Sequence, residues 1–388
     1  MKTSKIIVFG AGKIGRSFIG QVFHRTGYEV VFVDINKDLI NLINLKREYA
    51  VIIKDGDKNE TLHIRNIRGV HLTDEKSVIS ELKDAEITSL SVGKQGLRSA
   101  VPIIAKALIA RRQKFGDLPL DIIIAENMRD ADKFLSDELK NYLPSEYPFN
   151  SLVGLVETSI GKMVPIMKKK DMDEDPLQVF AEPYNSLIVA KSGFKNQIPN
   201  SPFIFPKDNI KAWVDRKLFI HNMGHATVAY LGFHKYPEAI YLHEVLDDSQ
   251  LLEEVRKTMI QSAVILQSLY PKEFTLQQLE DHVDDLIHRF RNKSLGDTVF
   301  RVGCDLYRKL GPDDRLVTPI RAALKMSKPY NLILNALYAG MAFKAKDENG
   351  NYFPDDILFF EDLKKGHSHI FESVCKLPFL LTENDLIL

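Results

Sequence analysis

A lysine, an asparagine and a histidine follow one another closely in the second half of the chain. Asn222 lies five residues after Lys217, and His225 lies eight residues after it. The apolar run 226–231 continues the segment, and no acidic residue follows Lys217 until Glu238. Burial lowers the pKa of a lysine because it disfavours the charged form. Lys217 is therefore predicted to act as a general base near neutral pH.

Further polar groups are expected to accompany this lysine. Oxidation of an alcohol needs a base for the hydroxyl proton and donors for the oxygen that becomes negative. At 3.6 residues per turn, Asn222 and His225 are neighbours, and His225 lies about 80° around the helix from Lys217. Asn127 follows the apolar run 121–125, and the carboxyl ends of parallel strands face the ligand crevice. Together Lys217, Asn127, Asn222 and His225 suit alcohol oxidation without a metal.

These residues also have structural interpretations. Asn127 is equally well explained as a turn asparagine, and the segment that begins at Arg216 as the packed polar start of a helix. His221 has no assigned chemistry, and we interpret it as structural. Neither Cys304 nor Cys375 has a cysteine or histidine at metal-ligand spacing. We therefore expect two reduced, packed thiols and no bound metal.

A glycine-rich loop near the N-terminus has the pattern of a dinucleotide site. It follows the apolar run 5–9 and opens a helix. The first glycine permits a tight turn, the second lets a pyrophosphate approach, and the third lets the helix pack on the sheet. The helix N-terminus offers N–H groups to phosphates. Glycines also mark ordinary turns, but this context favours cofactor contacts by Gly10, Ala11, Gly12, Lys13, Ile14, Gly15 and Arg16.

Asp34 indicates which dinucleotide is bound. It lies 19 residues after Gly15, at the end of a second apolar run, 29–34. A carboxylate there hydrogen-bonds the adenosine ribose and repels a 2′-phosphate. The alternative is that Asp34 caps the following helix. No arginine follows at once, since Ile35 and Asn36 come next, so NAD is predicted as the cofactor rather than NADP.

Charge and composition limit the possible partners. The 388 residues include 52 basic and 52 acidic residues, and 45% are hydrophobic. A neutral chain of this composition is a soluble globular protein and is a poor candidate for coating nucleic acid. The N-terminus has no pattern of a signal peptide, and no apolar run is long enough to span a membrane. We therefore expect a cytoplasmic protein with a small-molecule substrate.

The arrangement of apolar runs predicts two domains of an α/β protein. Five apolar runs show no alternation of apolar and polar residues, and helical stretches separate them. This order predicts a doubly wound parallel sheet. The runs are 5–9, 29–34, 86–92, 121–125 and 151–156. The segment 51–65 reads as an inserted hairpin. Residues 196–207 are rich in Pro and Asn, which suggests a boundary between domains 1–200 and 201–388. The second domain is predicted to be mainly helical, with helices at 251–270, 275–291, 317–326 and 330–343.

The sequence resembles the polyol-specific long-chain dehydrogenases, the mannitol dehydrogenase family, and within it the mannitol-1-phosphate 5-dehydrogenases. The Lys217, Asn222 and His225 spacing carries the resemblance, together with the glycine loop and Glu126 to Met128. It extends from about residue 5 to about residue 345. Further motifs that agree are Glu182-Pro183, Arg289 to Asn292, Arg301-Val302, Arg308 to Leu310 and Asp314 to Leu316.

This resemblance implies an N-terminal Rossmann-type domain, a mainly α-helical C-terminal domain, catalysis in the cleft between them and a monomer. It implies Lys217 as the base, Asn127 and Asn222 on the reacting oxygen, and His225 on a substrate hydroxyl. The short chain and three cations favour the phosphate-using subfamily, because clustered cations suit an anionic group. These cations are Arg308, Lys309 and Arg315. The alternative interpretation of these three cations is that they form surface ion pairs with Asp305, Asp313 and Asp314.

Two positions depart from the family pattern and bear on the polyol. Gly161-Lys162 stands where the family usually has Asp-Arg, with Glu157 as a possible replacement, and Leu187 stands where an aromatic residue is frequent. The leading interpretation is oxidation of D-mannitol 1-phosphate to D-fructose 6-phosphate. Its rivals are a dehydrogenase for a non-phosphorylated polyol or a sugar acid, and a redox sensor that binds NAD(H) without turnover. A sensor has no need of a base such as Lys217.

Overall fold

The computed structural model describes residues 4–126, 128 and 130–377. The chain divides into two compact units, Met1–Val214 and Asp215–Leu388. This division lies beyond the boundary at residues 200 and 201 that the sequence suggests, because β11 (Ile204–Lys207) belongs to the N-terminal sheet and the segment before it is bonded to that sheet. Asp121, inside that sheet, accepts hydrogen bonds from the backbone N–H groups of Lys195 at 2.8 Å and Asn196 at 3.1 Å.

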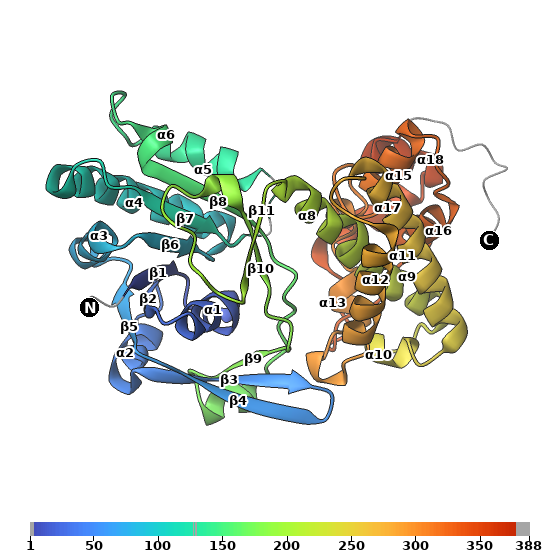
Figure 1. The fold of residues 1–388 in the computed structure, drawn as a ribbon. Coiled ribbons are helices and arrows are strands. Elements are labelled where there is room, and N and C mark those ends of the chain that lie inside the picture. The colour runs from blue at the N-terminus through green and yellow to red at the C-terminus, as the bar shows by residue number, and fades with distance from the viewer. Residues whose placement is uncertain (1–3, 127, 129, 378–388) are drawn as a thin grey trace. The chain divides into compact units, whose positions relative to one another are not determined.

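The N-terminal unit is built on an eight-stranded sheet (Figure 1) with the order β11-β10-β8-β7-β6-β1-β2-β5. The four central pairs and the β2–β5 edge are parallel, β10 is antiparallel to β8, and β11 is parallel to β10. The strands are β1 (Lys5–Phe9), β2 (Glu29–Asp34), β5 (Ile67–His71), β6 (Ile87–Leu90), β7 (Leu120–Ile124), β8 (Val153–Ser159), β10 (Leu187–Ala190) and β11 (Ile204–Lys207).

Helices cover both faces of this sheet (Figure 1). Ile6 and Val8 of β1 belong to one apolar core, while Ile7 and Phe9 belong to the other. A strand buried on both faces needs apolar residues at every position, which is why these runs show no alternation. The helices of this unit are α1 (Gln21–Arg25), α2 (Lys37–Lys46), α3 (Glu75–Asp84), α4 (Gly93–Phe115), α5 (Ala131–Lys140), α6 (Phe149–Leu152) and α7 (Lys169–Glu174).

The predicted hairpin forms a second, three-stranded sheet rather than a part of the main one. Strands β3 (Glu48–Asp55) and β4 (Lys58–Arg65) pair antiparallel, and β9 (Val179–Ala181) adds to β3 in parallel. The buried side chain of Tyr49 joins the same core as α1, and its hydroxyl donates to the carbonyl oxygen of Arg16 at 2.7 Å. The small sheet is thereby fixed to the helix that follows the glycine loop.

Among the described residues of the C-terminal unit, the regular structure is helical (Figure 1), apart from an isolated bridge between Tyr241 and Thr298. A mainly helical second unit after a wound sheet confirms the predicted fold class. Its helices are α9 (Met223–Lys235), α10 (Leu242–Val245), α11 (Ser249–Leu269), α12 (Leu276–Phe290), α13 (Val299–Gly303), α14 (Leu306–Lys309), α15 (Val317–Lys325), α16 (Asn331–Met341), α17 (Pro354–Leu363) and α18 (His367–Ile370).

The sequence suggested that a helix begins near Arg216, but in the structure α9 begins at Met223, after other helical turns. Helix α8 (Ile210–Arg216) runs directly into a π-helical turn, Lys217–Asn222, and this turn runs into α9. The apolar α9 is central to the unit: its Gly224 lies against Met259 of α11, where an added Cβ would come within 2.6 Å of the methionine sulfur. Such close packing explains why an almost wholly apolar helix is stable here.

Two expectations from composition can be compared with the structure. Cys304 and Cys375 are free and buried, as predicted for packed thiols. Among the helices formed by the described residues, none combines the length and apolarity needed to cross a bilayer.

Candidate active site

The glycine loop between β1 and the following helix has the geometry of a phosphate-binding turn. Gly10 has a φ of +94°, and a Cβ there would lie 2.3 Å from the Ser91 carbonyl oxygen. A Cβ on Gly15 would lie 1.8 Å from the Gly10 carbonyl oxygen. At Gly12, by contrast, a Cβ would meet nothing within 4 Å among the described atoms. Gly10 and Gly15 therefore serve the packing of the loop, and Gly12 leaves an open side where a ligand can approach the backbone.

Asp34 ties the end of β2 to this loop. One carboxylate oxygen accepts a hydrogen bond from the Ala11 N–H at 2.7 Å, and the other accepts from the Asn36 N–H at 2.8 Å. The cap of α2 is Asn36, whose side chain accepts from the Leu39 N–H, so the alternative role of Asp34 as that cap is wrong. Each carboxylate oxygen has a further lone pair for a ribose hydroxyl.

Arg16 has a structural role that the sequence did not reveal. Its buried guanidinium donates to the carbonyl oxygens of Ala11 at 2.7 Å and Leu177 at 2.5 Å. Burial lowers the pKa of Arg16, and nearby Tyr49 and Asp34 oppose that change. A buried guanidinium must satisfy its donors on nearby acceptors, and the side chain thereby joins the glycine loop to the segment before β9. The neighbouring Gly12 and Lys13 are exposed.

The π-helical turn changes the relation between Lys217 and Asn222. In a regular α-helix, residues five apart point about 140° away from each other. In a π-helical turn the backbone bond runs from i to i+5, so the two residues lie closer to the same side of the helix. Burial lowers the pKa of Lys217 to about 8, and the positive charge of Arg315 contributes to the decrease. The sequence-based expectation of a lowered lysine pKa is therefore met.

His225 is enclosed by an aromatic ring and a carboxylate. Its imidazole stacks on Phe290 with ring centroids 4.7 Å apart and an interplanar angle of 11°. Its Nε2 lies 2.9 Å from Oδ2 of the buried Asp297, and the other oxygen of Asp297 contacts the Arg301 guanidinium. Burial, followed by the charges of Arg301 and Arg315, holds the pKa of His225 well below its usual value. Both causes favour the neutral imidazole.

Five cations form what we name the cationic cluster. Burial first, and then Arg315 and Arg308, lower the pKa of Lys309 to about 8, while Cys304 opposes the change. The same Arg315 acts on Lys217 and His225, so the positive charges lie close enough to influence one another. The members of the cluster are Lys217, Arg289, Arg301, Lys309 and Arg315.

The three cations predicted to bind phosphate differ in their contacts. Arg308 is half exposed and pairs with Asp305 at 2.5 Å and Asp314 at 3.3 Å. Arg315 is buried and donates to Asp314 at 2.8 Å. The Lys309 ammonium donates to the carbonyl oxygen of Val302 at 2.7 Å and thereby caps the end of α13. The ion-pair alternative thus describes Arg308 and, through Asp314, Arg315 as well, while Arg315 and Lys309 also lie in the cationic cluster.

One predicted site residue cannot be placed in the described part of the chain, and one residue beside the predicted site was not predicted from the sequence. Asn127 lies outside the described residues. His221 is buried beside the Phe290 ring, in line with a structural interpretation. Asp297 was missed, although its spacing of four residues from Arg301 is a signal for a helical ion pair. Among the described residues, no group of three or more His, Cys, Asp or Glu side chains is arranged to hold a metal ion.

The two departures from the family pattern are both occupied by structural residues. The buried Lys162 ammonium donates to the carbonyl oxygens of Glu182 at 2.8 Å and Tyr184 at 2.6 Å. Leu187 is fully buried in the core of the N-terminal unit. Leu187 therefore acts on packing, and Lys162 orders the segment that connects β9 and β10.

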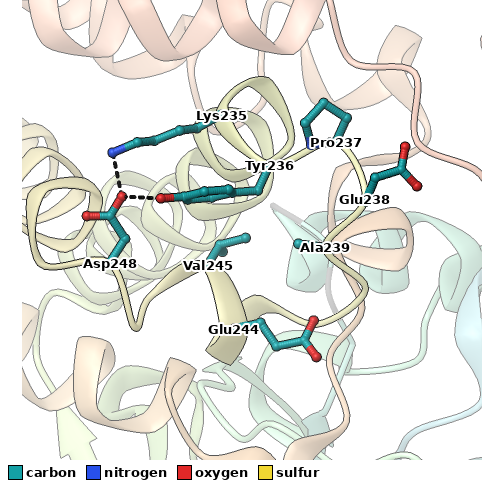
Figure 2. Close-up of a pocket in the computed structure, with 8 residues that line it drawn as sticks. All are labelled: Lys235, Tyr236, Pro237, Glu238, Ala239, Glu244, Val245 and Asp248. Atoms are coloured by element: carbon teal, nitrogen blue, oxygen red, sulfur yellow. Dashed lines mark hydrogen bonds and ion pairs between the residues drawn. The ribbon is translucent and has the colours of Figure 1, made fainter.

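A cavity of about 630 Å³ lies at the opposite, C-terminal end of α9 (Figure 2). One of its walls is an ionic network in which Asp248 accepts from the Lys235 ammonium and, at 2.7 Å, from the Tyr236 hydroxyl (Figure 2). Asp248 also caps α11 by accepting from the N–H of Gln250. No predicted catalytic residue lines this cavity, and its polar wall is accounted for by the connection between α9 and α11. The lining residues are Lys235, Tyr236, Pro237, Glu238, Ala239, Glu244, Val245 and Asp248.

A mainly parallel sheet with a glycine loop after its first strand, followed by a helical unit, defines a two-domain protein of the Rossmann class. The sequence matches the mannitol dehydrogenase Rossmann domain over residues 4–202 and the mannitol dehydrogenase C-terminal domain over residues 209–376. The chain belongs to the mannitol dehydrogenase family.

Solved structures support the same fold at low sequence identity. A ternary complex of Pseudomonas fluorescens mannitol 2-dehydrogenase with NAD and D-mannitol is similar with a TM-score of 0.68 and 17% identity, over 90% of this chain and 81% of that one. A substrate-free D-sorbitol dehydrogenase is similar with a TM-score of 0.77 and 17% identity, over 97% of this chain and 88% of that one. Similarity at this identity shows the shared fold.

Proposed function

We propose that this protein is a cytoplasmic NAD-dependent dehydrogenase that oxidises a sugar-alcohol phosphate to a ketose phosphate, with D-mannitol 1-phosphate and D-fructose 6-phosphate as the pair. The observation that carries the proposal is Lys217, whose pKa is lowered to about 8 within a cationic cluster. A lysine with this pKa is partly neutral at physiological pH and can accept a proton. The nearby cations favour an anionic substrate.

The glycine loop fits a dinucleotide. The open side at Gly12 and the exposed Lys13 leave space for a pyrophosphate, while Asp34 stands at the end of β2 for the adenosine ribose. When bound, NAD supplies the hydride acceptor. Asp34 supports NAD over NADP because its carboxylate repels a 2′-phosphate.

The residues of the π-helical turn and α9 supply the proton chemistry. The neutral amine of Lys217 accepts the proton of the reacting hydroxyl. The Asn222 amide donates to the same oxygen and stabilises its developing negative charge. The neutral imidazole of His225 binds another hydroxyl of the substrate. Burial, with a contribution from the positive charge of Arg315, lowers the pKa of Lys217 and so increases the fraction of neutral amine that this role requires.

Support for a phosphate comes from the local potential. Burial is the largest cause of the lowered pKa of both Lys217 and His225, and the positive charges of nearby cations add to it, so these cations contribute a positive field at both side chains. A phosphate dianion is attracted to such a field, and arginine can bind two of its oxygens at once. A non-phosphorylated polyol is the second candidate, favoured by the ion pairs of Arg308 and Arg315 with Asp314.

One assay tests the proposal and separates these candidates. We expect NADH oxidation with D-fructose 6-phosphate to be far more efficient, by kcat/KM, than with D-fructose. Equal efficiency with both ketoses would support the non-phosphorylated polyol instead. Binding of NADH without turnover across a panel of ketoses, ketose phosphates and keto acids would support the redox sensor.

A further inference from the structure

The two ring nitrogens of His225 lie in different surroundings. Nε2 is buried, faces Asp297 Oδ2 at 2.9 Å, and has no aligned hydrogen-bond partner among the described residues. The imidazole as a whole keeps 14% of its side-chain surface exposed. Since Nε2 is shielded, Nδ1 is the nitrogen that remains available to a ligand. Which nitrogen carries the proton therefore decides whether His225 offers a ligand an acceptor or a donor.

Asp297 is held so that one of its oxygens faces the ring. Its side chain is only 6% exposed, and its Oδ1 contacts the Arg301 guanidinium. Its backbone carbonyl oxygen accepts from the Leu242 N–H at 3.0 Å. Phe290 fixes the plane of the imidazole by stacking on it. Oδ2 is left facing Nε2, and at this separation a small rotation of either side chain completes a hydrogen bond.

We propose that Asp297 is a positioning residue that keeps the proton of His225 on Nε2, so that Nδ1 accepts a hydrogen bond from a substrate hydroxyl. A carboxylate is an acceptor only, so it favours the tautomer with N–H directed at it. Burial favours the neutral ring most, and the surrounding cations from α13, the segment before α15, α14 and α12 add to it: Arg301, Arg315, Lys309 and Arg289. The role assigned to Nδ1 rests on the proposed polyol function, whereas the tautomer does not.

The tautomer can be measured directly on the intact, substrate-free protein. Nitrogen-15 NMR of protein labelled at its 11 histidines, with His225 assigned by its loss in His225→Gln, distinguishes a protonated ring nitrogen from a bare one. We expect Nε2 to be protonated and Nδ1 to be bare at pH 7. A proton on Nδ1, or an equal mixture of the two tautomers, would overturn the proposal.

Asp297→Asn tests the consequence for binding. An amide can present either a donor or an acceptor, so we expect the NMR signals to shift toward a mixture of tautomers. Loss of one neutral hydrogen bond corresponds to an increase in KM for the polyol of about 2- to 10-fold, with a smaller change in kcat. The same substitution in a His225→Gln background should add nothing further. An equal additional effect there would mean that Asp297 does not act through His225.

Asp285→Asn is a matched control. It also removes one carboxylate beside the cationic cluster, since Asp285 pairs with Arg289 at 3.5 Å, but Asp285 is half exposed and its ion pair in the described part of the chain is with Arg289 rather than with His225. We expect its kinetic constants to stay within about twofold of the wild type and its tautomer signals to be unchanged. If Asp285→Asn altered the His225 signals as Asp297→Asn does, general charge loss would explain both, and the proposal would fail.

The outcomes separate this inference from the proposed function. The expected tautomer in a protein that turns over no polyol or polyol phosphate leaves the Asp297 assignment in place and rejects the proposed function. Polyol turnover with the proton on Nδ1 retains the function and rejects the Asp297 assignment. Should Asp297→Asn fail to fold, the wild-type spectrum still decides the tautomer.

Discussion

The glycine loop of the N-terminal unit and the cationic cluster of the C-terminal unit are built on different principles. In the loop, the polar side chains are matched to the backbone, as with Asp34 on Ala11 and Arg16 on Leu177. In the cluster, buried ionisable groups oppose one another, and Lys217 and His225 are driven toward their neutral forms. The loop therefore gains its function from backbone shape, whereas the cluster gains its function from unfavourable electrostatics.

This difference predicts where substitutions act. A change in the loop is expected to alter packing or the approach of a ligand, because shape is what its glycines provide. A change in the cluster is expected to alter proton affinity and substrate charge preference with less effect on the fold. The predictions below test this contrast in order of decreasing effect.

Lys217→Ala should show the largest effect on catalysis. Removal of a general base lowers turnover by roughly 10²–10⁴-fold, while binding of NADH, followed by fluorescence titration, should be retained. The matched control is Lys211→Ala, which removes an exposed lysine of α8. Near-normal turnover by Lys217→Ala, or an equal loss in Lys211→Ala, would show that another group is the base.

The preference for a phosphorylated substrate should depend on Arg315 more than on Arg308. Two charge-assisted contacts of about 1.5–3 kcal/mol each give a preference on the order of 10²–10⁴ for D-fructose 6-phosphate over D-fructose. Arg315→Ala should remove much of this preference, because Arg315 lies in the cationic cluster. Arg308→Ala should remove less, because Arg308 is half exposed and paired with Asp305.

The measurement for both variants is kcat/KM with the two ketoses. A loss of the same size for both ketoses would mean that these arginines act on stability alone. The phosphate site would then be discarded, and the dehydrogenase proposal would stand on Lys217.

The sequence predicted the loop better than the cluster for a physical reason. Gly10, Gly12, Gly15 and Asp34 act through neighbours in a single strand-helix-strand unit, so their spacing is informative by itself. The importance of Asp297 depends on His225, which lies far away along the chain, and no local pattern records that contact. Likewise, the π-helical turn at Lys217 was missed because an amphipathic or apolar pattern does not reveal a change from α to π hydrogen bonding.

The extent of the sheet was also harder to predict than its centre. The central strands carry continuous apolar runs, and such runs predict buried strands directly. Strand β11 contains Pro206 in a Pro- and Asn-rich stretch, so its residues resemble a linker in sequence. Its place in the sheet depends on pairing with β10 and on the bonds from Lys195 and Asn196 to Asp121.

Gly15→Ala and Gly12→Ala should separate packing from ligand approach within the loop. An added methyl at Gly15 overlaps the Gly10 carbonyl oxygen, and overpacking of this kind costs about 1–3 kcal/mol. Gly12 has open space around it, so Gly12→Ala should change the free energy of unfolding by no more than about 0.5 kcal/mol. Urea unfolding measures both values.

The same two variants should differ in NADH affinity. Gly12→Ala should bind NADH more weakly in spite of its unchanged stability, because the methyl occupies the side from which a pyrophosphate approaches the backbone. Wild-type affinity in Gly12→Ala would show that the cofactor does not contact the loop at this position.

The pH dependence of the reaction should report the pKa of Lys217. The pKa is lowered to about 8, and the base must be neutral to accept a proton from an alcohol. Below pH 8 the lysine is increasingly protonated, so kcat/KM for polyol oxidation should fall by about tenfold per pH unit. Above pH 8 the amine is mostly neutral, and this group should add little further increase.

The cationic cluster is also expected to affect this pH profile. Arg315 lowers the pKa of Lys217 through its positive charge, although burial is the larger cause. In Arg315→Ala the acidic limb of the profile should therefore move to higher pH, toward the ordinary value of lysine. Steady-state rates from pH 6 to 10, measured with a non-phosphorylated polyol to exclude effects on phosphate binding, check the direction. An unchanged acidic limb in Arg315→Ala would mean that the positive charges of the cationic cluster do not affect the pKa of Lys217. The contrast between backbone shape in the N-terminal unit and electrostatics in the C-terminal unit would then rest on the burial of Lys217 alone.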